Sequence, residues 1–133
     1  MSPLFGKSEE KKAEEAAAQA EVERINALPV AELARELMPA FGPDGARAGK
    51  EINSLQASTW LLRSHPRGGS HLRELHKAVC EGIECLERAG LVEVLGGKRG
   101  SVATGAHLRA SRLGETALAE NSLDQHLHGL GAA

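Results

Sequence analysis

Two histidines and two cysteines that lie close together in the chain are the side chains best suited to chemistry, because imidazoles and thiolates bind metal ions. His76 and Cys80 are four residues apart, a spacing that places both on one side of a helix. The full set of His71, His76, Cys80 and Cys85 spreads around the helix, however. It also lacks the pair of cysteines separated by two residues that is typical of structural zinc sites. The sequence therefore predicts no metal site.

The two cysteines also give no indication of redox chemistry. Cys80 and Cys85 are five residues apart in an apparently helical stretch, so their side chains point to different faces and form a poor disulfide pair. Helical periodicity turns Cys85 outward. An exposed thiol is reactive only where its pKa is lowered, and nothing in the spacing indicates such a shift. We therefore assign no thiol sensor.

The other motifs that could do chemistry are incomplete. The glycine-rich segment Gly96-Gly97-Lys98-Arg99-Gly100 lacks both the spacing of a phosphate-binding loop and a helix signal after it. No serine–histidine–aspartate set and no paired carboxylates stand out in a chain this rich in glutamate. The sequence predicts a protein without catalytic residues or cofactors, and not an enzyme.

Charge is distributed unevenly along the chain. The formal net charge is -2, yet the window from Arg63 to Arg112 contains nine positive and five negative residues. A locally basic domain between acidic ends is compatible with a polyanionic partner. Aromatic residues make up only 2% of the chain, which argues against a platform for stacking single-stranded bases. No apolar run approaches the length of a membrane span or a signal peptide, so we expect no membrane partner and a cytoplasmic location.

The chain divides into four parts by composition. Residues 1–28 form a charged helical or disordered arm, dense in Glu, Lys and Ala and with little apolar surface to dock. Residues 29–49 hold an extra N-terminal helix and a linker, residues 50–127 form the main domain, and residues 128–133 are a loose tail. The predicted protein is therefore a single domain with additions in front of it.

Apolar periodicity predicts the elements of that domain. A first helix runs from about Lys50 to Ser64, and Gly90 ends the next helical stretch in a left-handed conformation. Leu72 to Leu86 fits either one continuous helix or two helices, and we favour a break near Ala78. The period then changes, and the remaining elements are expected as a strand at 91–95, a strand at 106–110 and a helix at 111–120.

Three segments of this pattern resemble winged helix-turn-helix domains, in particular MarR-like and PadR-like bacterial transcriptional regulators. Trp60-Leu61-Leu62 before a glycine-rich turn looks like the end of the first core helix of the family. Leu86-Glu87-Arg88-Ala89-Gly90-Leu91-Val92 looks like the junction of recognition helix and wing, and Ala110-Ser111-Arg112-Leu113-Gly114-Glu115 like the segment that closes the wing.

The resemblance implies a fold and a function. The fold is α+β and mostly helical, a winged helix with a three-helix core and a two-stranded β wing, preceded by an additional N-terminal helix and a charged N-terminal arm. The family's pattern also needs two helices before the junction glycine, for which Ser70 to Gly90 is a tight fit. The implied function is a transcriptional regulator that binds double-stranded DNA.

Basic residues on the third helix, the wing and their flanks are the predicted contacts to DNA. The predicted nucleic-acid-binding residues are Arg67, Arg73, Lys77, Arg88, Lys98, Arg99, Arg109 and Arg112. Glu81 and Glu84 are expected on the same face of the helix as Lys77 and Arg88, where they oppose a negatively charged groove. The alternative function is therefore a winged-helix module that binds a protein partner and no DNA.

The extra N-terminal helix leaves a further alternative open. Its apolar stripe of Val30, Leu33 and Leu37 either packs on the domain through Ile52 and Leu62 or forms the contact of a homodimer. Packing on the domain is the favoured interpretation.

Overall fold

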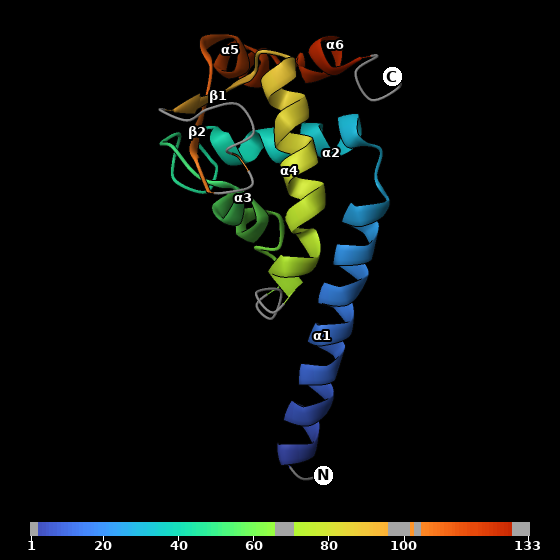
Figure 1. Ribbon diagram of the computed structural model, residues 1–133. Helices are drawn as coiled ribbons and strands as arrows, with labels where there is room; N and C mark the ends of the chain where they lie inside the picture. Colours follow the sequence, from blue (N-terminus) through green and yellow to red (C-terminus); the bar gives the residue numbers. More distant parts are fainter. Residues whose placement is uncertain (1–2, 66–70, 96–101, 103–104, 129–133) are drawn as a thin grey trace.

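The chain is mostly helical with one small antiparallel sheet, as the sequence predicted (Figure 1). The computed structural model describes residues 3–65, 71–95, 102 and 105–128. The helices are α1 (Pro3–Ala27), α2 (Val30–Leu37), the 3-10 helix η1 (Met38–Phe41), α3 (Ser54–Leu61), α4 (Leu72–Arg88), α5 (Arg112–Glu120) and α6 (Leu123–Leu127). The strands are β1 (Val92–Leu95) and β2 (His107–Ala110). None of the helices in these ranges is long and apolar enough to cross a membrane.

Helix α4 is the centre of the core. It packs against α2 and α3 and also contacts α1 and β1, and Figure 1 shows it crossing the body of the molecule among them. Leu75, Val79, Ile83 and Leu86 follow one another at spacings of four, four and three residues, and all four are fully buried. Gly82 lets α2 approach closely, because a Cβ atom there would lie 2.6 Å from Cδ1 of Leu37.

Helix α4 is continuous, so the predicted break near Ala78 is wrong. No glycine or proline turn interrupts the segment at that point, and Ala78 is itself a strong helix former. The helix ends as predicted: Gly90 has a φ of 77°, and the amides of Gly90 and Leu91 donate to the carbonyl oxygens of Glu87 and Leu86. One long helix therefore occupies the segment that the family's pattern fills with two.

The start of α3 also differs from the prediction. The helix begins at Ser54 rather than near Lys50, because Asn53 and Gln56 form a reciprocal cap in which each side chain accepts the other's backbone N–H at 2.9 Å. Ile52 is extended and exchanges two backbone hydrogen bonds with Leu108 of β2, of 2.8 and 2.7 Å. The residues before α3 thus pair with the edge of the sheet at a single isolated bridge.

The two strands pair where the sequence placed them. Val92 lies opposite Ala110 and Val94 lies opposite Leu108, in an antiparallel register. Ser111 caps α5 as predicted, since its hydroxyl oxygen accepts the N–H of Gly114 at 3.0 Å. The hairpin therefore leads directly from α4 into α5.

Helix α2 belongs to the core rather than to its periphery. Leu33 and Leu37 are buried, Val30 is half-buried, and all three join the apolar cluster that contains Ile52 and Leu62. The favoured interpretation of this stripe, packing on the domain, is confirmed. Because the stripe is covered within one chain, it does not offer a free surface to a second copy.

The charged arm forms one long helix whose two halves differ. In its last turns, Ala18, Val22 and Ile25 are buried at a four- and three-residue spacing, so the expectation that the arm has little to dock is wrong for this half. Every residue from Glu9 to Ala17 is exposed, and Figure 1 shows that this half of α1 projects away from the body. From Glu9 onward, three buried side chains thus anchor the helix to the body.

An ion-pair cluster reinforces that anchor. The guanidinium of Arg24 donates two hydrogen bonds to the carboxylate of Glu36 in α2, at 3.0 and 2.8 Å, and one to Glu21 in its own helix. These bonds raise the pKa of Arg24, and the bond from Arg24 holds the pKa of Glu36 below its usual range. Asn26 adds a 3.2 Å bond from its side-chain amide to the carbonyl oxygen of Glu74.

Candidate nucleic-acid interface

One side of α4 is exposed along its whole length. Arg73, Lys77, Glu81, Glu84 and Arg88 follow one another at spacings of four, four, three and four residues, and all five are exposed. This is the helical period, so the five side chains form one stripe on the side away from the buried residues. We call it the α4 stripe.

The charges of the α4 stripe are ordered along the helix. Its N-terminal half presents Arg73 and Lys77, neither of which forms a salt bridge with another described residue. Glu81 and Glu84 follow, and Arg88 stands at the end of the helix. The predicted basic residues on α4 therefore share one face, but two carboxylates interrupt it before the last arginine.

The remaining predicted residues lie elsewhere. Arg109 in β2 stands opposite Glu93 in β1, and its Nε donates a 3.1 Å hydrogen bond to that carboxylate, so its charge is neutralised locally. Arg112 is exposed at the start of α5. Arg67, Lys98 and Arg99 lie outside the described residues. The structure thus brings together three of the eight predicted residues, on α4.

Two basic residues that the sequence analysis did not single out lie near the hairpin. Arg47 and Lys50, from the segment before α3, line a shallow pocket together with Glu51 and Arg109. His107 of β2 reaches Glu51 at 3.5 Å. In the sequence, only the positive charge of Arg47 and Lys50 could have marked them. They lie near Arg109 because Ile52 pairs with Leu108 of β2, and no local pattern indicated that pairing.

Both cysteines are buried, which corrects the prediction that Cys85 faces outward. Cys80 is 7% exposed and Cys85 is 0% exposed. Because α1, α2, α3 and β1 all pack on α4, its buried arc is wider than a single apolar stripe suggests. Burial raises the pKa of both thiols, which favours the unreactive protonated form.

The histidine and cysteine predicted to share a helix side do so. Sγ of Cys80 lies 3.8 Å from Nε2 of His76. Among the described residues, however, no three histidine, cysteine or acidic side chains are grouped so that they could hold a metal ion.

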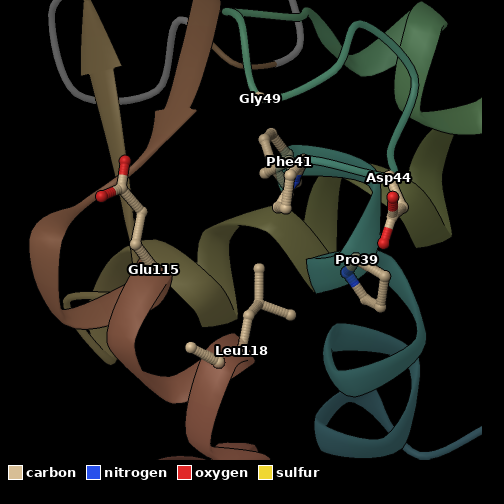
Figure 2. Close-up of a pocket in the computed structure, with 9 residues that line it drawn as sticks. Pro39, Phe41, Asp44, Gly49, Glu115 and Leu118 are labelled. Atoms are coloured by element: carbon tan, nitrogen blue, oxygen red, sulfur yellow. The ribbon is translucent and has the colours of Figure 1, made fainter.

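A groove outside the α4 stripe was not foreseen either. It lies between η1, the loop that follows it and α5, and Pro39, Phe41, Asp44, Glu115 and Leu118 are among the residues that line it (Figure 2). Its two sides are far apart in the sequence, so no motif or spacing could have indicated it.

No protein-family model, curated protein or solved structure matches the chain.

Proposed function

We propose that the chain is a winged-helix module that binds double-stranded DNA through α4. The order of elements supports this fold if the three core helices are assigned differently from the sequence prediction. Helix α2 takes the place of the first core helix, α3 the second and α4 the third, and the strand segment at Ile52 lies between the first two. The β1–β2 hairpin then takes the place of the wing. With this assignment the segment before Gly90 needs only one helix, so the tight fit disappears.

The observation that carries the proposal is the α4 stripe. Helix α4 packs on α2 and α3 with one side and leaves a charged side free over 17 residues, about 26 Å of helix. The major groove of B-DNA, about 12 Å wide, accepts a helix presented in this way. Arg73 and Lys77 supply positive charge at its N-terminal half, where no described carboxylate neutralises them.

Titration of a random duplex by fluorescence anisotropy over a series of salt concentrations tests this function. We expect roughly micromolar binding at low salt that weakens steeply as salt rises. The double variant Arg73→Ala/Lys77→Ala should bind more weakly at every sequence, and the salt slope should fall by about 0.9 for each phosphate that the variant no longer neutralises.

The matched control removes the same charge elsewhere. Lys11 and Lys12 are exposed on the projecting half of α1, so Lys11→Ala/Lys12→Ala changes net charge equally and leaves the α4 stripe intact. Equal losses in the two double variants would reduce the effect to net charge and reject α4 as the DNA-binding surface. An absence of binding at low salt would reject DNA as the partner.

A protein partner is the second candidate, because Glu81 and Glu84 lie within the α4 stripe. Two carboxylates facing phosphates oppose binding, whereas facing a basic protein surface they favour it. The variant Glu81→Gln/Glu84→Gln separates the two functions. It should tighten DNA binding, by roughly two- to fivefold for each charge removed, if α4 faces phosphates. An unchanged affinity for DNA would favour the protein-binding function.

A further inference from the structure

The groove between η1 and α5 has the dimensions of a ligand site. Its volume is about 560 Å³, within the range of roughly 300–1,000 Å³ common for small-molecule pockets. One side is formed by η1 and the loop from Gly42 to Gly49, and the other by Glu115, Leu118 and Ala119 of α5. Figure 2 shows both sides with the space between them.

Backbone contacts hold the loop side of the groove in place. The amides of Gly42 and Gly45 donate to the carbonyl oxygens of Pro39 and Gly42, and the amide of Ala46 donates to that of Ala40, each at 3.0 Å. Gly42 also touches α5, since a Cβ atom built on it would lie 2.9 Å from Cδ1 of Leu118. The two sides therefore meet at the base of the groove, which is formed before any ligand arrives.

The groove combines an apolar interior with acidic edges. Pro39, Pro43 and Leu118 supply its accessible apolar lining, whereas Phe41 is only 1% exposed. Figure 2 shows the carboxylates of Asp44 and Glu115 on opposite sides of the groove. Both acidic residues are exposed, and neither forms a salt bridge with another described residue. None of the described residues that line the groove is a lysine, arginine or histidine. The charged side chains of this described lining are therefore all acidic, and an anionic ligand is disfavoured.

We propose that this groove binds a small organic cation with an apolar body, such as an arylalkyl amine. The apolar body packs on Pro39, Pro43 and Leu118, and the ammonium group is balanced by Asp44 or Glu115. This site is separate from the α4 stripe, so the proposal does not depend on DNA binding.

The direct test is a two-dimensional amide NMR titration of the full chain with three probes of nearly the same shape. The probes are 2-phenylethylamine, 2-phenylethanol and phenylacetate, which are cationic, neutral and anionic. We expect the amine to shift the amides of Gly42, Gly49 and Ala119, with millimolar affinity, and to bind at least about threefold more tightly than the alcohol. Phenylacetate should leave these amides unchanged.

Substitutions then show which carboxylate balances the ammonium group and whether the amine binds in the groove. Asp44→Asn and Glu115→Gln should each be tested, and loss of the carboxylate that balances the ammonium should weaken amine binding by about two- to fivefold. Glu120→Gln is the matched control, because Glu120 is exposed on α5 but does not line the groove. Ala119→Phe should block the groove and abolish the shifts for the amine.

Three outcomes would overturn the proposal. The first is equal affinity for the amine and the alcohol. The second is an effect of Glu120→Gln on amine binding as large as that of both groove variants. The third is an absence of amide shifts at about 10 mM amine, a concentration that occupies most of any millimolar site. A variant spectrum that matches the parent outside the groove shows that each substitution leaves the fold intact.

Discussion

Helices α4 and α1 are both long and charged, yet the protein holds them in opposite ways. Helix α4 buries four large apolar residues, Leu75, Val79, Ile83 and Leu86, along its full length and contacts four other elements. Among its residues from Glu9 onward, helix α1 buries Ala18, Val22 and Ile25 near its C-terminal end, and every residue from Glu9 to Ala17 is exposed.

The difference shows what decides whether a charged helix becomes part of a fold. Helical propensity is high in both, since α1 is rich in Ala, Glu and Lys. Stability of the docked helix comes instead from apolar side chains repeated on one face, because each removes surface from water. On α4 a charged face is available for function because the opposite face holds the helix in the core. The stretch of α1 from Glu9 to Ala17 is exposed and is not held in this way.

The largest effect is expected at the centre of α4. Ile83→Ala removes a fully buried side chain from a position surrounded by α2 and other core elements, and should lower the free energy of unfolding by about 4 kcal/mol. Urea denaturation followed by circular dichroism measures it. A loss below about 1 kcal/mol would mean that α4 is not the packed centre of the core.

A smaller loss is expected from the same chemical change in α1. Ile25→Ala removes a side chain that is 1% exposed, but the contacts of α1 with the body are few, so undocking of α1 limits the cost to about 2 kcal/mol. The same urea titration gives the value. If Ile25→Ala cost as much as Ile83→Ala, the two helices would be equally integrated and the contrast between them would fail.

Gly82→Ala sharpens the comparison because packing and helical propensity predict opposite changes in the free energy of unfolding. Alanine is the better helix former by about 1 kcal/mol, but its Cβ would lie 2.6 Å from Cδ1 of Leu37 and 3.2 Å from Cγ of Leu33. We expect packing to dominate and the variant to be less stable by about 1 to 2 kcal/mol. A rise in the melting temperature would show that α2 and α4 are not in close contact at this point.

The pair of Arg24 and Glu36 makes the docking of α1 sensitive to acid. The pKa of Glu36 is lower in the folded chain than in the unfolded chain, so its contribution is complete above the ordinary carboxyl pKa of about 4.3 and is lost as pH falls through the lower folded value. Because both side chains are partly exposed, the contribution is about 1 kcal/mol or less.

Thermal melts of the parent and of Glu36→Gln between about pH 7 and pH 3 check this linkage. The variant should be less stable near neutral pH, and the difference should shrink toward acid. A difference that is constant over the whole range would assign the loss to packing rather than to the ion pair.

The smallest effect is expected in the projecting half of α1. Ala16→Gly costs about 1 kcal/mol inside a supported helix, but Ala16 lies in the stretch from Glu9 to Ala17, in which every residue is exposed. The global free energy of unfolding should therefore change by less than about 0.5 kcal/mol. Amide hydrogen exchange should be fast from Glu9 to Ala17 and protected around Val22. Slow exchange over the whole of α1 would show that the first half is held by contacts as well.

Local patterns anticipated much of the fold. The class, the hairpin, the cap at Ser111 and the left-handed Gly90 were all predicted, because each depends on residues within a few positions of one another. The same patterns misplaced the start of α3 and the break near Ala78. In both places the outcome depended on a partner outside the window: Ile52 was drawn into the sheet, and α4 was held straight by its neighbours.

The candidate site could be predicted only in part. Periodicity placed Lys77, Glu81, Glu84 and Arg88 on one exposed face, because the helical period alone determines which side chains share a side. It turned Cys85 outward in error. How wide the buried arc of a helix becomes depends on how many elements pack on it, and the sequence of the helix does not contain that number.

The sequence by itself determined the short-range features of this protein: where helices cap and end, which residues repeat on one face, and where charge accumulates. These follow from hydrogen bonds and periodicity within one or two turns of chain. Only the tertiary structure decided that Val22 and Ile25 anchor α1, that Arg109 is neutralised by Glu93, and that Phe41 and Leu118 line one groove. Each of these depends on contacts between residues distant in the chain, whose formation is governed by packing of the whole core.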